Sequence, residues 1–240
     1  MKIIRVFQII AVGVALVCVP GALTVIVLFK ADPVISSNIA SIILIISLVT
    51  LLLSPCFYSN EGNRTIKEKL ITICSIWLLV SGIAHVTWEL SWCFVHPYLH
   101  NVTAEDTWAW IWWAYGVADR RYLVSEPSTV ILEWVTATVG GPLTLYAAYL
   151  QRKSTMQKAS IFILIASLMD LYGAFLYFGT EILDGFYYID TEQFVNFWIK
   201  FLGLNSLWVF FSILCIYIAI NTLLQRPAIE SEKNWGRWSR

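Results

Sequence analysis

The sequence predicts an all-α integral membrane protein, a helical bundle of about six transmembrane helices. Composition is the first observation behind this prediction. The 240 residues are 58% hydrophobic and only 13% charged, with a mean hydropathy of +0.70, which lies outside the usual range of soluble domains. The second observation is a series of apolar windows long enough to cross a bilayer. The third is that basic residues gather in alternate loops between these windows.

Six windows have the predominantly apolar length, about 20 residues, that one span requires. They cover about residues 3–29, 34–53, 70–95, 127–150, 159–183 and 194–224. The first is longer than the apolar region of a secretory signal, so we interpret it as an uncleaved span. The fourth has a clear start, because Ser125 can cap a helix and Pro127 suits its first turn. The chain has no internal repeat, which favours one bundle domain.

Loop charges predict the orientation, because cytoplasmic loops carry an excess of Lys and Arg. When the six spans alternate, the basic loops fall on the same side as both chain ends. The internal basic loops contain Arg64, Lys67, Lys69, Arg152, Lys153 and Lys158. The loop at 184–192, on the other side, is purely acidic. We therefore expect both termini to be cytoplasmic.

Charge and cysteine usage exclude two classes of function. The formal net charge is +0 and no Lys/Arg-rich run is present, so the basic footprint that nucleic-acid binding needs is missing. The five cysteines are scattered, without a C-x-x-C pair or a His/Cys metal spacing. We expect buried free thiols and no metal site.

Ionisable side chains inside the predicted spans are the candidate functional groups, because they are costly at membrane depth unless they are used or satisfied. His85 and Glu89 stand at i and i+4 on one helix face. In the fourth span, Glu133 shares a face with Thr136. Two carboxyl groups inside a bundle require protonation, a cationic partner or strong hydrogen bonds. These positions therefore indicate a polar site inside the bundle.

The fifth and sixth spans also carry polar stripes. Asn205 and Trp208 stand at i and i+3 in the sixth span. The stripe of the fifth span consists of Asp170, Gly173, Tyr177 and Glu181. Glu181 is close to the acidic loop, so we expect it to be solvated, and Asp170 is equally compatible with helix pairing. The tryptophans at 108–113 are typical either of an interfacial belt or of a lid over a cavity.

Acid-base chemistry on an alkene suits such a site. Burial favours the protonated form of a carboxyl group, which can then deliver its proton to a weak base. Protonation of an alkene leaves a carbocation, and the face of Trp208 can stabilise it by cation-π attraction. His85 or Glu89 can then remove a proton from a neighbouring carbon. The predicted reaction moves a C=C bond and requires no metal or redox cofactor.

At these residues the chain resembles the emopamil-binding protein family, the membrane sterol Δ8-Δ7 isomerases that share the EXPERA domain. The matching motifs are His85-x-x-x-Glu89, Tyr115-x-x-x-Asp119-x-Arg121-Tyr122, Glu133-x-x-Thr136, Tyr172-Gly173-x-x-Leu176-Tyr177 and Asn205-x-Leu207-Trp208. They stand in the order of the family and at its approximate spacing, between about residues 34 and 224.

The resemblance implies an intramolecular isomerase with a five-helix core at 34–224. The predicted helix at 1–33 is additional to this core, and the loop charges predict a cytoplasmic tail at 225–240. It implies that His85, Glu89 and Glu133 handle protons, that Asn205 orients them, and that Trp208 supports the cation. The implied substrate-binding residues are Tyr115, Asp119, Arg121, Tyr122, Thr136 and Tyr177. It further implies an endoplasmic reticulum membrane, with a hydrophobic sterol or terpenoid substrate entering from the lipid.

Departures from the family pattern keep other functions open. Ala114 stands where these isomerases have a glutamate, and Asp170 and Ala174 replace an expected glutamine and aspartate. A changed pocket lining favours a changed substrate, so one alternative is a terpene or meroterpenoid cyclase that uses the same acid. Another is a non-catalytic sterol-binding EXPERA protein. A homodimer is also left open.

Overall fold

A computed structural model of the chain describes residues 2–57 and 65–225, with side chains from residue 6 onward. Six helical segments in this part are long and apolar enough to cross a membrane, which confirms the predicted spans. They are Val6–Phe29, Pro33–Phe57, Ile66–Tyr98, Pro127–Lys153, Met156–Leu183 and Val195–Leu224. The described residues contain no β-strand beyond one isolated bridge between Asp119 and Ile189. Arg64 and residues 226–240 of the predicted tail lie outside the described residues.

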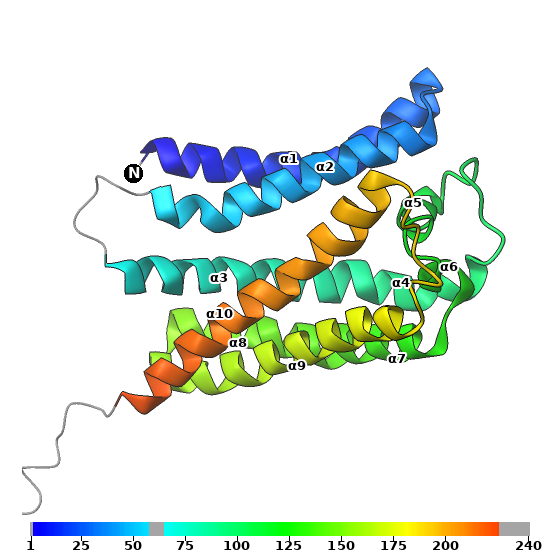
Figure 1. Cartoon of the computed structure of the whole chain (residues 1–240). Coiled ribbons are helices and arrows are strands. Elements are labelled where there is room, and N and C mark those ends of the chain that lie inside the picture. Colours follow the sequence, from blue (N-terminus) through cyan, green and yellow to red (C-terminus); the bar gives the residue numbers. More distant parts are fainter. Residues whose placement is uncertain (1, 58–64, 226–240) are drawn as a thin grey trace, which may run out of the picture.

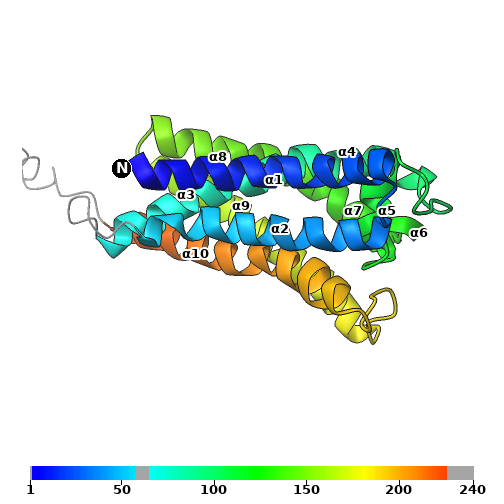
Figure 2. The same cartoon turned by 90° about the horizontal axis from the view of Figure 1, so that it is seen from above.

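The first two spans form a pair. Helix α1 (Lys2–Phe29) packs along α2 (Pro33–Leu53), which continues into a 3₁₀ turn at Ser54–Phe57 (Figure 1). The third span begins with α3 (Ile66–Ala84), which packs against α8 (Gly141–Lys153) and α10 (Asn205–Leu224). Helix α9 (Met156–Leu183) packs against α8 and α10 as well. In Figure 2 the α1 and α2 pair covers one side of the other helices.

Local signals in the sequence fix where the helices begin. Thr65 and Glu68 form a reciprocal capping box at the start of α3. Helix α7 (Pro127–Val135) has Pro127 in its first turn, as expected, but Glu126 caps it instead of Ser125. Burial opposes the charge of Glu126, yet hydrogen bonds from Ser128 and Thr129 lower its pKa. The expectation for Ser125 was wrong, because this residue adopts a left-handed conformation with φ of 54° and ends the preceding helix.

Three spans contain π-helical segments, which are rare and frequently mark functional sites. They are His85–Glu89 after α3, Thr136–Gly140 after α7 and Val195–Leu204 before α10. The first two pack against each other. Gly141 makes this approach possible, because a Cβ atom at Gly141 would lie 2.8 Å from the Cβ of His85. His85, Glu89 and Thr136 therefore lie where two spans approach each other closely and are irregular.

The segment between the third and fourth spans closes one end of the bundle. After α4 (Leu90–Val95) and a short 3₁₀ turn at His96–Tyr98, it forms α5 (Trp110–Gly116) and α6 (Arg121–Val124). Trp110 and Trp112 are buried, whereas Trp108 is exposed. Trp110 packs in a cluster with Ile26 of α1. Most of this tryptophan-rich segment therefore packs on the helices. It positions Tyr115 near the C-terminal end of α5.

Candidate active site

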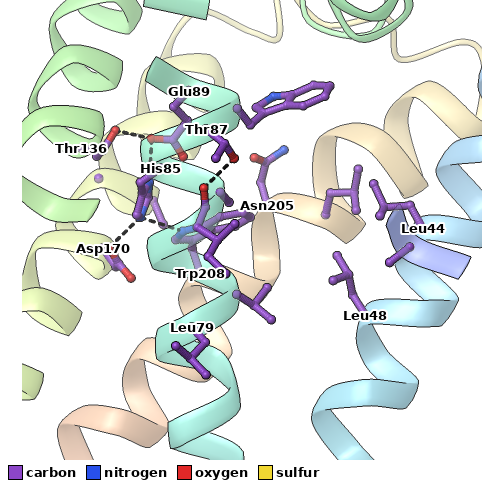
Figure 3. Close-up of a pocket in the computed structure, with 18 of the residues that line it drawn as sticks. Leu44, Leu48, Leu79, His85, Thr87, Glu89, Thr136, Asp170, Asn205 and Trp208 are labelled. Carbon is purple, nitrogen blue, oxygen red and sulfur yellow. Dashed lines mark hydrogen bonds and ion pairs between the residues drawn. The ribbon is translucent and has the colours of Figure 1, made fainter. Parts of the chain in front are cut away.

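A cavity of about 660 Å³ lies within the bundle and contains the candidate residues. Its two ends differ. At one end the wall includes the polar side chains of His85, Glu89 and Glu133. The other end is lined mainly by aliphatic side chains from α1, α2 and α3. Figure 3 shows Leu44 and Leu48 of α2 across the cavity from His85 and Asp170.

His85 and Glu89 are in direct contact, as their i, i+4 spacing predicts. The Nδ1 atom of His85 lies 2.6 Å from Oε2 of Glu89. The same carboxylate oxygen accepts a hydrogen bond of 2.5 Å from Oγ1 of Thr136 (Figure 3). One oxygen of Glu89 is therefore held by two neighbours, and the side chain remains 14% exposed toward the cavity.

A second carboxylate holds the other side of the imidazole, and it was missing from the predicted site. Oδ1 of Asp170 on α9 lies 3.2 Å from Nε2 of His85. Ser81, one turn before His85, donates to Oδ2 of Asp170 over 3.1 Å and lies 3.0 Å from Nε2. The polar stripe of the fifth span contained Asp170, but the sequence left helix pairing equally open.

This arrangement favours a doubly protonated imidazole. Each ring nitrogen of His85 faces a carboxylate oxygen, and only the imidazolium form donates from both nitrogens. A charged ring between two carboxylates also avoids burying unpaired anions. In this form the indole Nε1 of Trp208, 3.3 Å from Nε2, makes a packing contact with the ring instead of a hydrogen bond.

Glu133 is bonded differently from Glu89. Its Oε1 accepts a hydrogen bond from the hydroxyl group of Tyr122. Its Oε2 is buried and has no hydrogen-bond partner among the described residues. Tyr122 is itself fixed, because Nε1 of Trp92 donates to its backbone oxygen over 3.1 Å. Burial raises the pKa of Tyr122, so its hydroxyl stays a donor.

Tyr115, Tyr177 and Asn205 form a hydrogen-bonded group in the cavity wall. The hydroxyl of Tyr177 donates to Oδ2 of Asp119 over 2.7 Å, so the hydroxyl of Tyr115 donates to Tyr177 over 3.2 Å. Nδ2 of Asn205 in turn donates to the hydroxyl of Tyr115 over 2.9 Å. Burial raises the pKa of Tyr115, which keeps this phenol neutral. The hydrogen bonds of Asn205 run to these tyrosines and to backbone oxygens, not to the carboxyl groups.

Asp119 and Arg121 lie behind the cavity wall instead of in it. Arg121 makes an ion pair of 2.6 Å with Asp119 and one of 3.1 Å with Glu181. Its Nη1 also donates to the backbone oxygen of Tyr177 over 2.9 Å. Glu181 is only 1% exposed, so the expectation that it is solvated was wrong. These buried charges hold Tyr177 in place, and they influence the cavity through that residue.

The comparisons with known proteins agree with these motifs. Residues 107–219 match the family model described as EBP, the EXPERA (EXPanded EBP superfamily) domain. A probable 3-beta-hydroxysteroid-Delta(8),Delta(7)-isomerase of Oryza sativa is 32% identical over 133 residues, 55% of this chain and 59% of the relative. The chain therefore spans less than two thirds of the length of that relative.

Two further plant relatives are covered more fully. Isomeliandiol synthase of Melia azedarach is 32% identical over 62% of this chain and 68% of its own length. A probable 3-beta-hydroxysteroid-Delta(8),Delta(7)-isomerase of Arabidopsis thaliana is 30% identical over 73% of both chains. The relatives thus include proteins named as isomerases and as synthases. By these matches the chain belongs to the EXPERA, or expanded EBP, superfamily.

Proposed function

We propose that the chain is a membrane isomerase that shifts a C=C bond in a sterol or related polycyclic isoprenoid. The observation that carries this proposal is the pair of carboxyl groups at the polar end of the cavity, Glu89 and Glu133, which have different bonding partners. To move a double bond, an acid must protonate one alkene carbon, and a base must remove a proton from the carbon on the other side of the resulting cation. Two carboxyl groups in different environments are suited to these two roles.

Glu133 is the proposed acid. Its Oε2 is buried without a partner among the described residues, which is costly for a carboxylate but acceptable for a carboxylic acid in the wall of the cavity. Tyr122 donates to the other oxygen, so the proton of the acid belongs on Oε2. Transfer of this proton to an alkene carbon forms a C–H bond, leaves Glu133 as a carboxylate and leaves a carbocation on the adjacent carbon.

Glu89 is the proposed base. His85 and Thr136 hydrogen-bond to its Oε2, which stabilises the carboxylate form and leaves Oε1 without a protein partner among the described residues. Oε1 then removes a proton from the carbon next to the cation, and the C–H electron pair becomes the new double bond. Release of the proton from Glu89 to water and uptake of one proton from water by Glu133 restore the starting state, so no electron is gained or lost.

Trp208 is the proposed electrostatic support for the cation. It lines the cavity, and its ring centroid lies 5.9 Å from that of His85. An indole face attracts a cation, and a desolvated pair of this kind contributes about 2 kcal/mol. Asn205 supports the site indirectly, by fixing Tyr115 and Tyr177 in the wall.

The cavity also suits a substrate that arrives from the lipid. Leu16 of α1 lines the cavity and is nevertheless 70% exposed, so the cavity approaches the lipid-facing surface beside α1. We place the protein in the endoplasmic reticulum membrane, as the family resemblance implies, with both termini cytoplasmic, in keeping with the basic loops. We also retain the division into an N-terminal helix (1–33), a membrane domain (34–224) and a tail (225–240).

A second candidate function is a terpene or meroterpenoid cyclase. Asp170 favours it, because this carboxylate replaces an expected glutamine in the lining of the cavity, and a changed lining favours a changed substrate. Relatives named as synthases rather than isomerases support it as well. A non-catalytic sterol-binding protein is a weaker candidate. Binding alone does not require Glu133 with an unpaired carboxyl oxygen next to the hydrogen-bonded carboxylate of Glu89.

Expression in a yeast strain that lacks its own sterol Δ8-Δ7 isomerase tests the proposal. We expect Δ7 sterols to appear by mass spectrometry, and to be lost in the Glu133→Gln variant, which keeps the shape of the side chain. Glu126→Gln, at the cap of the helix that carries Glu133, is the matched control, because Glu126 does not line the cavity. Continued accumulation of Δ8 sterols, with the folded protein present in the membrane, would contradict the isomerase and favour the cyclase.

A further inference from the structure

Gln8 is a polar residue in the apolar end of the cavity, and the proposed reaction does not use it. The other residues that α1, α2 and α3 contribute to the wall are apolar, among them Val12, Leu16, Leu44, Leu51, Ile76 and Leu79. A glutamine within a transmembrane helix requires hydrogen-bond partners. The structure gives it only one among the described residues, Ser54, at 2.8 Å.

The contact with Ser54 determines how the amide is oriented. Oγ of Ser54 donates its proton to the backbone oxygen of Leu51 over 2.7 Å, so this hydroxyl can only accept from Gln8. The amide nitrogen of Gln8 therefore faces Ser54. Its carbonyl oxygen and its second N–H remain available to a ligand in the cavity.

The location of Gln8 restricts which part of a ligand can reach it. Ile76 and Leu79 of α3 line the apolar end, whereas His85 lies at the polar end. At 1.5 Å per residue, Ile76 and His85 are separated by about 13 Å along α3. In a sterol, the ring hydroxyl is near a double bond of the second ring, and the end of the side chain is much farther from it. Only the end of the side chain extends toward Gln8 when the double bond lies at Glu89 and Glu133.

We propose that Gln8 binds a hydroxyl group at the end of the substrate's side chain, so that the preferred substrate is an isoprenoid oxygenated at the end remote from the reacting double bond. This inference rests on the proposed function, since it places the reacting double bond at the carboxyl pair. The hydroxyl donates to the carbonyl oxygen of Gln8. Gln8 belongs to helix α1, so this selectivity would reside in the N-terminal helix.

Equilibrium binding separates this inference from the catalytic proposal. The two probes are cholestanol, which has no double bond to isomerise, and its derivative with a hydroxyl on the terminal branched carbon of the side chain. Quenching of tryptophan fluorescence in the purified full chain reports binding, because Trp88 and Trp208 line the cavity. We expect the hydroxylated probe to bind about 3- to 10-fold more tightly, as one neutral hydrogen bond provides.

In Gln8→Leu and Gln8→Met this preference is expected to disappear, while cholestanol still binds and thereby shows that the variants are folded. Thr24→Val is the matched control, a polar-to-apolar change on α1 outside the cavity, and it should keep the preference. Equal binding of both probes to the wild-type chain, or an undiminished preference in both Gln8 variants, would overturn the role of Gln8 alone. Failure of the wild-type chain to bind either probe would overturn the proposed substrate class as well.

Discussion

The two ends of the cavity are built from different parts of the chain and from opposite kinds of side chain. The polar end combines two irregular π-helical segments with α9, and its carboxyl groups have fixed hydrogen-bond partners. The apolar end is formed by regular stretches of α1, α2 and α3, which offer mainly aliphatic contacts. The polar end suits proton transfer, because preorganised groups stabilise a transition state more than a ground state. The apolar end suits uniform binding of a hydrocarbon, which changes KM more than kcat.

The largest effect is expected at the polar end, from Glu89→Gln. This change removes the base but keeps the size of the side chain, so kcat should fall about 10²- to 10⁴-fold. Binding of cholestanol should be retained, measured by tryptophan quenching. Full turnover in Glu89→Gln would contradict the assignment of catalysis to the polar end and of binding to the apolar end.

Trp208→Leu should have the next largest effect. Loss of the aromatic face removes a cation-π contribution of about 2 kcal/mol, which corresponds to a decrease of roughly 30-fold in kcat. Trp208→Phe is the matched control, because a phenyl ring keeps an aromatic face. Equal losses in the two variants would indicate a packing role for Trp208 instead of cation stabilisation.

Asp170→Asn should lower kcat about 10-fold and change the pH profile of the reaction. The amide keeps the shape of the side chain but loses the charge beside Nε2 of His85, so the imidazole releases a proton more readily. Activity that depends on the imidazolium is then lost at a lower pH, and the alkaline limb of the profile moves toward acid. An unchanged profile would show that Asp170 only pairs α9 with α3.

The smallest effect is expected at the apolar end. Leu44→Ala removes aliphatic surface from the wall, which costs about 1 to 2 kcal/mol of substrate binding. KM should rise roughly 5- to 30-fold while kcat stays unchanged. Steady-state kinetics would measure both constants, and a fall in kcat equal to the rise in KM would mean that this end takes part in the transition state.

The sequence predicted those features of the site that depend on local geometry. The i, i+4 spacing of His85 and Glu89 was enough to expect their contact, found at 2.6 Å. The six spans followed from apolar length alone and are confirmed. The contact of Asp170 with His85 depends instead on how α9 rotates against α3, which only packing decides. No pattern in one chain segment contains that information.

Two expectations were wrong for the same kind of reason. Glu181 looked solvated because it adjoins an acidic loop, but Arg121, which is distant in sequence, makes a buried ion pair with it. Ser125 looked like a helix cap, but its hydroxyl donates to the backbone oxygen of His96 instead. In both cases a partner that is remote in the chain replaced the local environment on which the prediction relied.

Deuterium incorporation tests the central claim, proton donation by the polar end of the cavity, most directly. The purified chain is incubated in D₂O with a Δ8 sterol, and the product is analysed by mass spectrometry. An exchangeable acid at Glu133 predicts one deuterium in each molecule of Δ7 product, and almost no product in the Glu133→Gln variant. A Δ7 product without deuterium, or undiminished formation of product by Glu133→Gln, would contradict the account.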